Sequence, residues 1–307
     1  MGRRCVRDPT MGLSRPRGTR VKKPAPDESL SGRDVVTHFL RREVKSIAYN
    51  EPLVHEGFDA EGVHQLRVSA RRLRSELQAM RRVLPRAPWR DLGEDLKWMG
   101  AVLGALRDLD VLAELFGDHL EEGTALRDSV LTTLDRRRAR RRDPVVDLLE
   151  SKRYARIVQR LGKLSDDPQL GDVGRTRASE LFMPALWEAS CTYLDAIGDP
   201  YERRSDEALH RVRIASKKCR YNFEIAALFL GDDARVVAEA LEAIQDVLGK
   251  IHDRVVAVSF LDTLGLEQET DLDVRRTLRA EIGELRPTWV AHFVDARRGI
   301  LKIFAQD

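Results

Sequence analysis

The sequence predicts an all-α protein made of two pseudo-symmetric antiparallel four-helix bundles that derive from an internal duplication. Apolar residues recur with the 3.6-residue period of amphipathic helices through nearly all of the chain after residue 28, and alternating β-branched runs are absent. Two sequence motifs each occur twice. The length of 307 residues is also sufficient for two domains.

The repeated motifs define the two halves. Residues 64–74 read HQLRVSARRLR and residues 210–220 read HRVRIASKKCR, so a histidine and the cations that follow it return after 146 residues. A second pair, LGALRD at 103–108 and LGKIHD at 248–253, follows at nearly the same offset. A duplicated unit explains both pairs.

Each half is expected to repeat one order of helices. A leading helix comes first, then the helix with the His/Arg motif, then a long helix with the Leu-Gly motif, and then closing helices. Short connections between them favour antiparallel packing. The expected helices span 31–49, 60–84, 88–118, 122–142 and 145–164 in the first half, and 174–197, 205–230, 233–263, 271–285 and 288–304 in the second.

Proline and glycine mark the expected helix boundaries. Pro52 predicts the end of the first helix, whereas Pro144 either restarts a helix as its first residue or kinks one long helix. The loop around 165–174 divides the chain. It separates an N-terminal bundle over 29–166 from a C-terminal bundle over 172–307.

Charge is distributed unevenly along the chain. Residues 1–24 hold eight cations and one acid, a net charge of +7, and we expect a disordered basic tail over 1–28. The rest holds 45 cations and 49 acids, a net charge of −4. A nucleic-acid-binding domain is more often basic throughout, and the aromatic content of 6% leaves few surfaces for base stacking. Segregated charge instead favours a focused anion site.

The remaining composition bounds the cellular setting. The three cysteines, Cys5, Cys191 and Cys219, have no metal-ligand spacing, which is typical of a reduced, cytoplasmic protein. The sequence contains no run of eighteen apolar residues and no secretory signal, so we expect no membrane partner.

The two basic motifs place their cations in line. At about 100° per residue, His64, Arg67, Arg71 and Arg74 fall on one side of a helix. Residues 210, 213, 217 and 220 do the same in the second copy. One such stripe could be a solvated helix face, but two at identical spacing favour anion binding. Arginine suits phosphate because its planar guanidinium stays charged and donates two parallel hydrogen bonds.

These motifs resemble the CHAD family, the conserved histidine α-helical domain. The resemblance rests on the two His/Arg stripes and the two Leu-Gly…Asp segments, and covers about residues 29–307. It implies two four-helix bundles related by a pseudo-twofold axis. It also implies binding of inorganic polyphosphate through a central basic surface, and association with polyphosphate granules.

The candidate binding residues follow from the stripes and from an arginine-rich run at 136–142. That run is either a solvated helix end or part of the binding surface. The expected polyphosphate-binding residues are His64, Arg67, Arg71, Arg72, Arg74, Arg137, Arg138, Arg141, His210, Arg213, Lys217, Lys218, Arg220 and Tyr221.

Two acids and two histidines have roles that the sequence leaves open. We expect Asp108 and Asp253 to orient an arginine or histidine donor, and Gly104 and Gly249 to allow close helix approach. The motif histidines either donate to phosphate or are structural. A metal site is disfavoured because their neighbours are cations.

The preferred hypothesis is a non-enzymatic polyphosphate-binding protein of the cytoplasm and its polyphosphate granules, without a cofactor. No Walker A, HExxH or carboxylate cluster for Mg²⁺ is evident. Granule proteins are possible partners, and nucleic acid is expected to bind only weakly. The alternatives are a generic polyanion or nucleic-acid binder, and an accessory to enzymes that metabolise polyphosphate or triphosphate.

Overall fold

The structure is a computed structural model that describes residues 27, 29–81, 83–85, 89, 91–201, 205–264 and 269–305. Most of the predicted tail over 1–28 lies outside the described residues. Apart from one isolated β-bridge, between Ser31 and Arg177, the regular structure of the described residues is helical. The all-α prediction is therefore confirmed.

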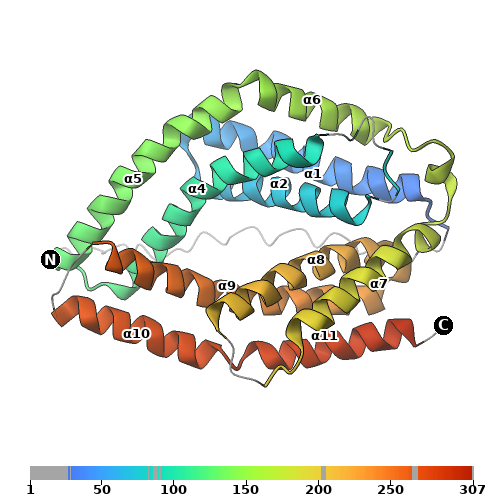
Figure 1. Ribbon diagram of the computed structural model, residues 1–307. Coiled ribbons are helices and arrows are strands. Elements are labelled where there is room, and N and C mark those ends of the chain that lie inside the picture. The colour runs from blue at the N-terminus through green and yellow to red at the C-terminus, as the bar shows by residue number, and fades with distance from the viewer. Residues whose placement is uncertain are drawn as a thin grey trace, which may run out of the picture.

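Within the described residues, the N-terminal half contains five long helices, whose course can be followed in Figure 1. They are α1 (Gly32–Gly57), α2 (Ala60–Ala79), α4 (Leu92–His119), α5 (Ala125–Glu150) and α6 (Lys152–Asp166).

In the described part of the chain, the C-terminal half begins with a short 3-10 helix, which five long helices follow. They are η1 (Gly171–Arg175), α7 (Ala178–Ile197), α8 (Asp206–Leu230), α9 (Asp232–Asp262), α10 (Glu269–Leu285) and α11 (Trp289–Phe304).

Side-chain caps explain where several helices begin. Ser31 and Asp34 form a reciprocal capping box at α1. Asp59 accepts a hydrogen bond from the Gly62 amide at α2, and Ser205 accepts one from the Ala208 amide at α8. These caps satisfy amides that have no partner within the helix, so both motif helices start where the sequence predicts.

The helix end predicted at Pro52 was wrong, whereas at Pro144 the alternative of one long helix holds. α1 continues through Pro52 to Gly57, because Ile47 and Val54 remain buried on either side of the proline and outweigh its one missing hydrogen bond. α5 continues through Pro144, and the break falls at Ser151. The Ser151 hydroxyl accepts from the amide of residue 154, so this cap, and not the proline, starts the next helix.

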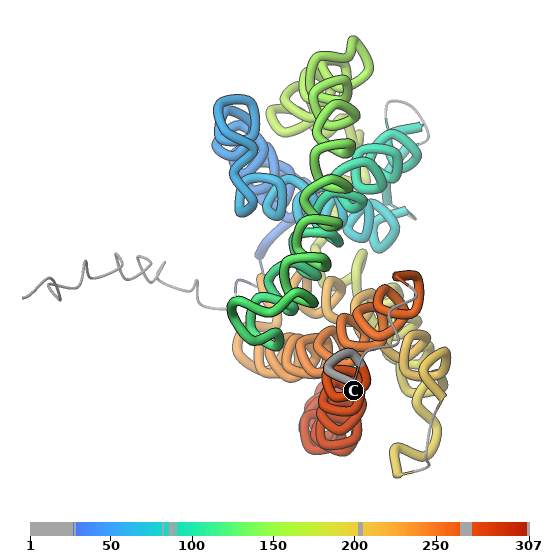
Figure 2. The backbone as a smooth tube through the Cα atoms, turned by 90° about the vertical axis from the view of Figure 1, so that its left-hand side faces the viewer, coloured from blue at the N-terminus to red at the C-terminus, as the bar shows by residue number. Residues whose placement is uncertain are grey.

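The main core runs through two groups of four helices. α1, α2, α4 and α6 pack together in one half, and α7, α8, α9 and α11 pack together in the other. The helix orders of the two halves correspond one to one. Figure 2 shows the N-terminal half above the C-terminal half in that view. Such an arrangement is what a duplication would leave, although the duplication itself stays a prediction.

A second, smaller core joins the far ends of the long helices. There α4 and α5 meet α9 and α10, at the left of Figure 1. Phe116 lies 5.7 Å from Phe260 between ring centroids, and Leu134 and Leu278 are fully buried in the same cluster. Glu281 of α10 accepts from Arg254 of α9 and contacts His119 of α4 at 3.0 Å. The two halves therefore share a core at this end.

α2 and α8 meet at the centre of the molecule. The two helices lie against each other and run in the same direction in Figure 1. Both motif helices are thus brought to one seam between the halves. None of the helices within the described ranges is long and apolar enough to cross a bilayer.

We predict that Phe116→Ala lowers the free energy of unfolding by about 3–5 kcal/mol, because it leaves a cavity in a closed core. Chemical denaturation monitored by circular dichroism measures this change. Leu301→Ala is the matched control, since Leu301 is 52% exposed and its truncation should change stability by about 0.5 kcal/mol or less. Equal losses in the two variants would contradict a structural role for the second core.

Candidate anion-binding site

The motif helices bury their apolar side and leave their cations at the seam. On α2, Leu66, Ala70 and Leu73 are buried, whereas Arg67 and Arg71 are only partly covered. The i, i+4, i+7 spacing of the buried residues fixes how the helix is rotated against its bundle. The arginines one position along from Leu66 and Ala70 consequently stand beside the core, toward the other half.

The side chain of Arg67, which belongs to α2, lies against α4 and is held there by a carboxylate. Its Nη1 donates to Oδ1 of Asp108 at 2.7 Å. A Cβ atom added to Gly104 would lie 3.4 Å from both Cζ and Nε of Arg67. Gly104, which was expected to allow close helix approach, therefore makes room for the guanidinium group of a residue on α2. In the second half, the atom nearest to an added Cβ at Gly249 is Nη2 of Arg213, at 4.0 Å.

Four cations from the two halves form what we call the central cluster: Arg67 and Arg71 of α2, and Arg213 and Lys217 of α8. The positive charges of Arg67 and Arg71 act on both Arg213 and Lys217. Burial, reinforced by these charges, lowers the pKa of Arg213, and Asp253 opposes the change. The Arg213 Nε is also buried without a hydrogen-bond partner.

Lys217 is the most perturbed member of the central cluster. Burial is the largest cause, and the charges of Arg213, Arg71 and Arg67 act in the same direction; together they lower its pKa from 10.5 to about 7. Across the seam, Nε of Arg71 donates to the hydroxyl of Tyr221 at 3.1 Å. Tyr221 was predicted to bind polyphosphate, but its side chain is buried. What it contributes in the structure is this contact between the halves.

The motif histidines lie at the edge of the central cluster. Burial and the charge of Arg107 lower the pKa of His64, while Glu61 opposes them. His210 is exposed, and its ring centroid lies 5.5 Å from that of His252. Burial and the charge of Arg213 likewise lower the pKa of His252.

Sequence reasoning missed Arg107 and His252 as neighbours of the site. Each directly precedes the aspartate of the second motif, and this equivalence was the signal that could have identified them. Burial raises the pKa of that aspartate in the second half, Asp253, against the opposing charge of Arg213.

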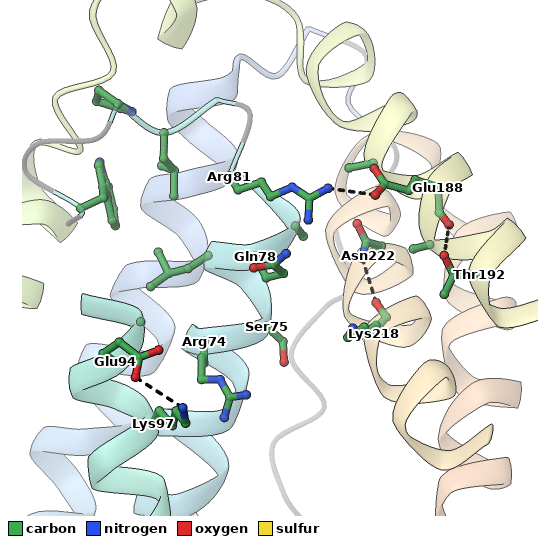
Figure 3. Close-up of a pocket in the computed structure, with 18 residues that line it drawn as sticks. Arg74, Ser75, Gln78, Arg81, Glu94, Lys97, Glu188, Thr192, Lys218 and Asn222 are labelled. Carbon is green, nitrogen blue, oxygen red and sulfur yellow. Dashed lines mark hydrogen bonds and ion pairs between the residues drawn. The ribbon is translucent and has the colours of Figure 1, made fainter. Parts of the chain in front are cut away.

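A cleft of about 760 Å³ lies between the two halves, along the C-terminal parts of α2 and α8 (Figure 3). Arg74 lines one wall and Lys218 the other, and both side chains are exposed. Lys97, which the sequence analysis missed, adds a third cation and contacts Glu94 at 3.5 Å.

An ion pair crosses this cleft. Nη2 of Arg81, just beyond the end of α2, donates to Oε1 of Glu188 on α7 at 2.9 Å, and Figure 3 shows the two side chains reaching toward each other. Both side chains are about half exposed. The pair thus links the halves in contact with solvent.

The prediction for Arg220 is not supported by its surroundings. Its side chain is 8% exposed, donates from Nε to Glu224 at 2.8 Å and pairs with Glu242 at 2.9 Å. Its charge is therefore balanced inside the C-terminal half. The reason is its neighbours: Glu224 of α8 and Glu242 of α9 hold the Arg220 guanidinium within the C-terminal half.

The side of the seam that contains Arg220 also carries a network of balanced charges in the N-terminal half. Arg42 donates to Glu43 at 2.7 Å and to Glu76 at 2.6 Å. Burial raises the pKa of Glu76 to about 8, against the opposing charge of Arg42, and the charge of Glu224 reaches Glu76 from the other half. Arg72 also faces Glu76, with its Nε buried and unpaired. The seam thus has one balanced side and one cationic side.

The predicted arginines of α5 lie away from the central cluster, along the periphery in Figure 1. Arg137 stacks over the ring of Phe260 at 4.8 Å, and Nε of Arg138 donates to the buried Asp110 at 2.7 Å. These two residues hold the second core together and do not line a central surface. Arg141 is exposed.

Metal binding finds no support in the described ranges, which contain no group of three or more His, Cys, Asp or Glu side chains placed to hold an ion. What the geometry brings together is an uncompensated cationic surface. Only one of the four cations of the central cluster has a carboxylate within ion-pair distance in the described part of the chain.

A protein-family model for the CHAD domain matches residues 38–262. Two uncharacterized proteins of Mycobacterium tuberculosis, MT2285 and Rv2226, are each 30% identical to the chain over 219 residues. That match covers 66% of this chain but 40% of each relative, so the chain spans well under half the length of these proteins.

Two solved structures are similar to most of the chain. The CHAD domain from the plant Ricinus communis has a TM-score of 0.69 and 28% identity, and the match covers 92% of this chain and 95% of that domain. PptA from Streptomyces chartreusis has a TM-score of 0.62 and 18% identity, covering 88% of this chain and 99% of that one, which supports the fold alone.

We predict that Glu76→Gln removes a pH dependence of stability. A carboxyl whose pKa is raised by folding stabilises the protein fully below its unfolded pKa, and this contribution is lost as pH rises through the folded value. With a folded pKa of about 8, the wild type should lose stability relative to Glu76→Gln between about pH 5 and pH 8. Thermal melts at several pH values measure the difference, with the exposed Glu94→Gln as control. Parallel curves for wild type and Glu76→Gln would contradict it.

Proposed function

The chain belongs to the CHAD domain family, and from this premise we propose that it binds long-chain inorganic polyphosphate, without catalysis, at the central cluster and the adjoining cleft. The observation that carries the proposal is the meeting of four cations from two helices, in a body whose net charge outside the first 24 residues is −4. Such a concentration of like charge is costly in the free protein and favourable once an anion enters.

The arrangement of the cations fits a linear polyanion. Arg74 follows Arg71 on α2 by one turn, and Lys218 follows Lys217 on α8. The cationic side of the seam therefore continues from the central cluster into the cleft, where Lys97 adds a further charge. A flexible chain with a charge on every phosphate could follow this track. Its affinity would rest on counterion release and fall steeply with salt.

Nucleic acid fits this surface less well. Binding of single strands depends on aromatic side chains on which bases stack. Tyr221, the aromatic residue in contact with the central cluster, is buried. The strongly exposed aromatic residues, Tyr49, Trp187 and Tyr201, are not part of the cleft. A phosphate backbone alone could bind, which leaves weak and unselective association.

The absence of catalysis is part of the proposal. Phosphoryl-transfer enzymes hold Mg²⁺ through carboxylates beside the phosphates. Here Asp108 is engaged by Arg67, and Asp253 faces Arg213. Both aspartates thus orient cations. We further propose that the protein works in the cytoplasm on polyphosphate granules, alongside granule proteins, and the alternative is an accessory role for enzymes that metabolise polyphosphate.

Competition binding tests the proposal. Long-chain polyphosphate, DNA and RNA are compared at matched phosphate concentration and several salt concentrations, with and without Mg²⁺. We expect polyphosphate to win at every salt concentration and to remain intact. Equal competition by DNA would favour a generic polyanion binder, and shortening of the polymer in the presence of Mg²⁺ would favour an enzyme.

We predict that Arg67→Gln and Arg213→Gln each weaken polyphosphate binding about tenfold or more, since a hydrogen bond to a charged group contributes about 1.5–3 kcal/mol. The double variant should lose more. Fluorescence anisotropy with labelled polyphosphate measures the affinity. Arg276→Gln is the matched control, because that arginine is 78% exposed and pairs only with the nearby Asp273. Unchanged binding by a folded double variant would contradict the proposal.

We also predict that Gly104→Ala weakens polyphosphate binding without unfolding the protein. The added Cβ would lie 3.4 Å from Cζ and Nε of Arg67, at the short end of van der Waals contact, so we expect it to restrict how far the guanidinium can turn from Asp108 toward a ligand. Gly117→Ala, on the same helix, is the control, because an added Cβ there meets nothing within 4 Å. Both changes should favour the helix by up to about 1 kcal/mol. The same affinity in both variants would show that the position of the Arg67 guanidinium beside Gly104 does not affect polyphosphate binding.

A further inference from the structure

Lys217 occupies the position in the second motif that Arg71 occupies in the first. It is the one member of the central cluster whose side chain can lose its charge within the physiological pH range. It is partly covered by the helices around it. The described residues contain no ion pair between Lys217 and a carboxylate. Its surroundings therefore decide whether it carries a charge.

The charged groups that face Lys217 come from each element at the seam. Arg67 and Arg71 act on it from α2, and Arg213 and Arg220 act from α8 itself. The carboxylates nearby are already engaged by other cations. Asp108 of α4 binds Arg67, Asp253 of α9 faces Arg213, and Glu224 and Glu242 bind Arg220.

Glu188 of α7, which lines the adjoining cleft, pairs with Arg81. The field at the Lys217 amine is consequently positive, and it favours the neutral amine in the free protein.

We propose that Lys217 selects for polyanions with closely spaced charges, by taking up a proton only when such a ligand fills the central cluster. This inference rests on the proposed function and adds a basis for ligand choice. Four permanent guanidinium or ammonium charges in so small a space would repel one another in the empty protein. A lysine relieves that repulsion by releasing its proton, which an arginine cannot do.

Ligand binding reverses the balance. Phosphate oxygens next to Lys217 favour the ammonium form, so proton and polyanion bind cooperatively. Neighbouring phosphates of a polyphosphate chain each carry a charge and can neutralise several cations of the cluster together. A phosphodiester strand carries one charge per nucleotide, so fewer charges reach the cluster at once. Lys217 then stays largely neutral, and the phosphodiester strand forms one ionic contact fewer than polyphosphate does.

Proton uptake upon binding gives a direct test. Isothermal titration calorimetry at pH 8 in two buffers with different ionisation enthalpies measures the number of protons taken up. With a pKa of about 7 in the free protein, Lys217 is about one-tenth protonated at pH 8, so binding long polyphosphate should add about 0.9 proton at this site. Single-stranded DNA at matched phosphate concentration should cause a clearly smaller uptake.

Lys217→Arg is the matched variant, because it restores in α8 the residue that α2 has at this position. It should still bind polyphosphate but lose most of the proton uptake. It should also bind DNA with affinity closer to that for polyphosphate. His64→Gln/His210→Gln should keep the uptake at pH 8. Lys217→Met provides a second route if Lys217→Arg is poorly folded: it should lose the uptake and bind polyphosphate more weakly.

The outcomes separate this inference from the proposed function. If the wild type does not bind polyphosphate, both are overturned. If it binds and Lys217→Arg or Lys217→Met takes up as many protons as wild type, only the role of Lys217 is overturned. Equal proton uptake with DNA and polyphosphate would overturn the selection by charge spacing.

Discussion

The repulsion between the cations of α2 and α8 is the interaction that the rest of the structure must offset. Arg67, Arg71, Arg213 and Lys217 face one another from two helices that run side by side. In an isolated pair of helices this repulsion would separate them. Here each helix is anchored in its own bundle, and the bundles are joined at the seam and through the second core. Apolar burial over the whole molecule thus holds together a charge arrangement that is unfavourable on its own.

The seam resolves this repulsion differently on its two sides. On one side the charges of Arg42 and Arg220 are each matched by two carboxylates of the same half, and the charge of Glu224 also acts on Arg42 from the other half. On the other side positive charge is left over, and the cleft opens there. The charge balance of the seam is therefore asymmetric, although the two halves are similar. Breaking the buried charge network on the balanced side would be costly, whereas the positive charges left over on the other side repel one another in the free protein.

Much of the fold could be predicted from the sequence, because helix periodicity and caps are local. The motif helices begin at Asp59 and Ser205, where capping residues stand. Proline boundaries could not be predicted, since tertiary burial carried α1 past Pro52. The site was predictable to the extent that charges shared one helix face.

Residues whose partners come from other helices were not predictable. Arg220 has the spacing of a binding residue, but Glu242 lies 22 positions further along the chain, and only folding brings the two together. In the sequence, Arg137 looks like an unpaired cation, but in the fold its guanidinium group stacks over the ring of Phe260.

If the two halves descend from one ancestral unit, the second core has a consequence for that unit. A single half would have exposed Phe116 and Leu134 at the tip of a helical hairpin. Such a polypeptide would have needed another apolar surface to cover them, and a second copy of itself would supply one.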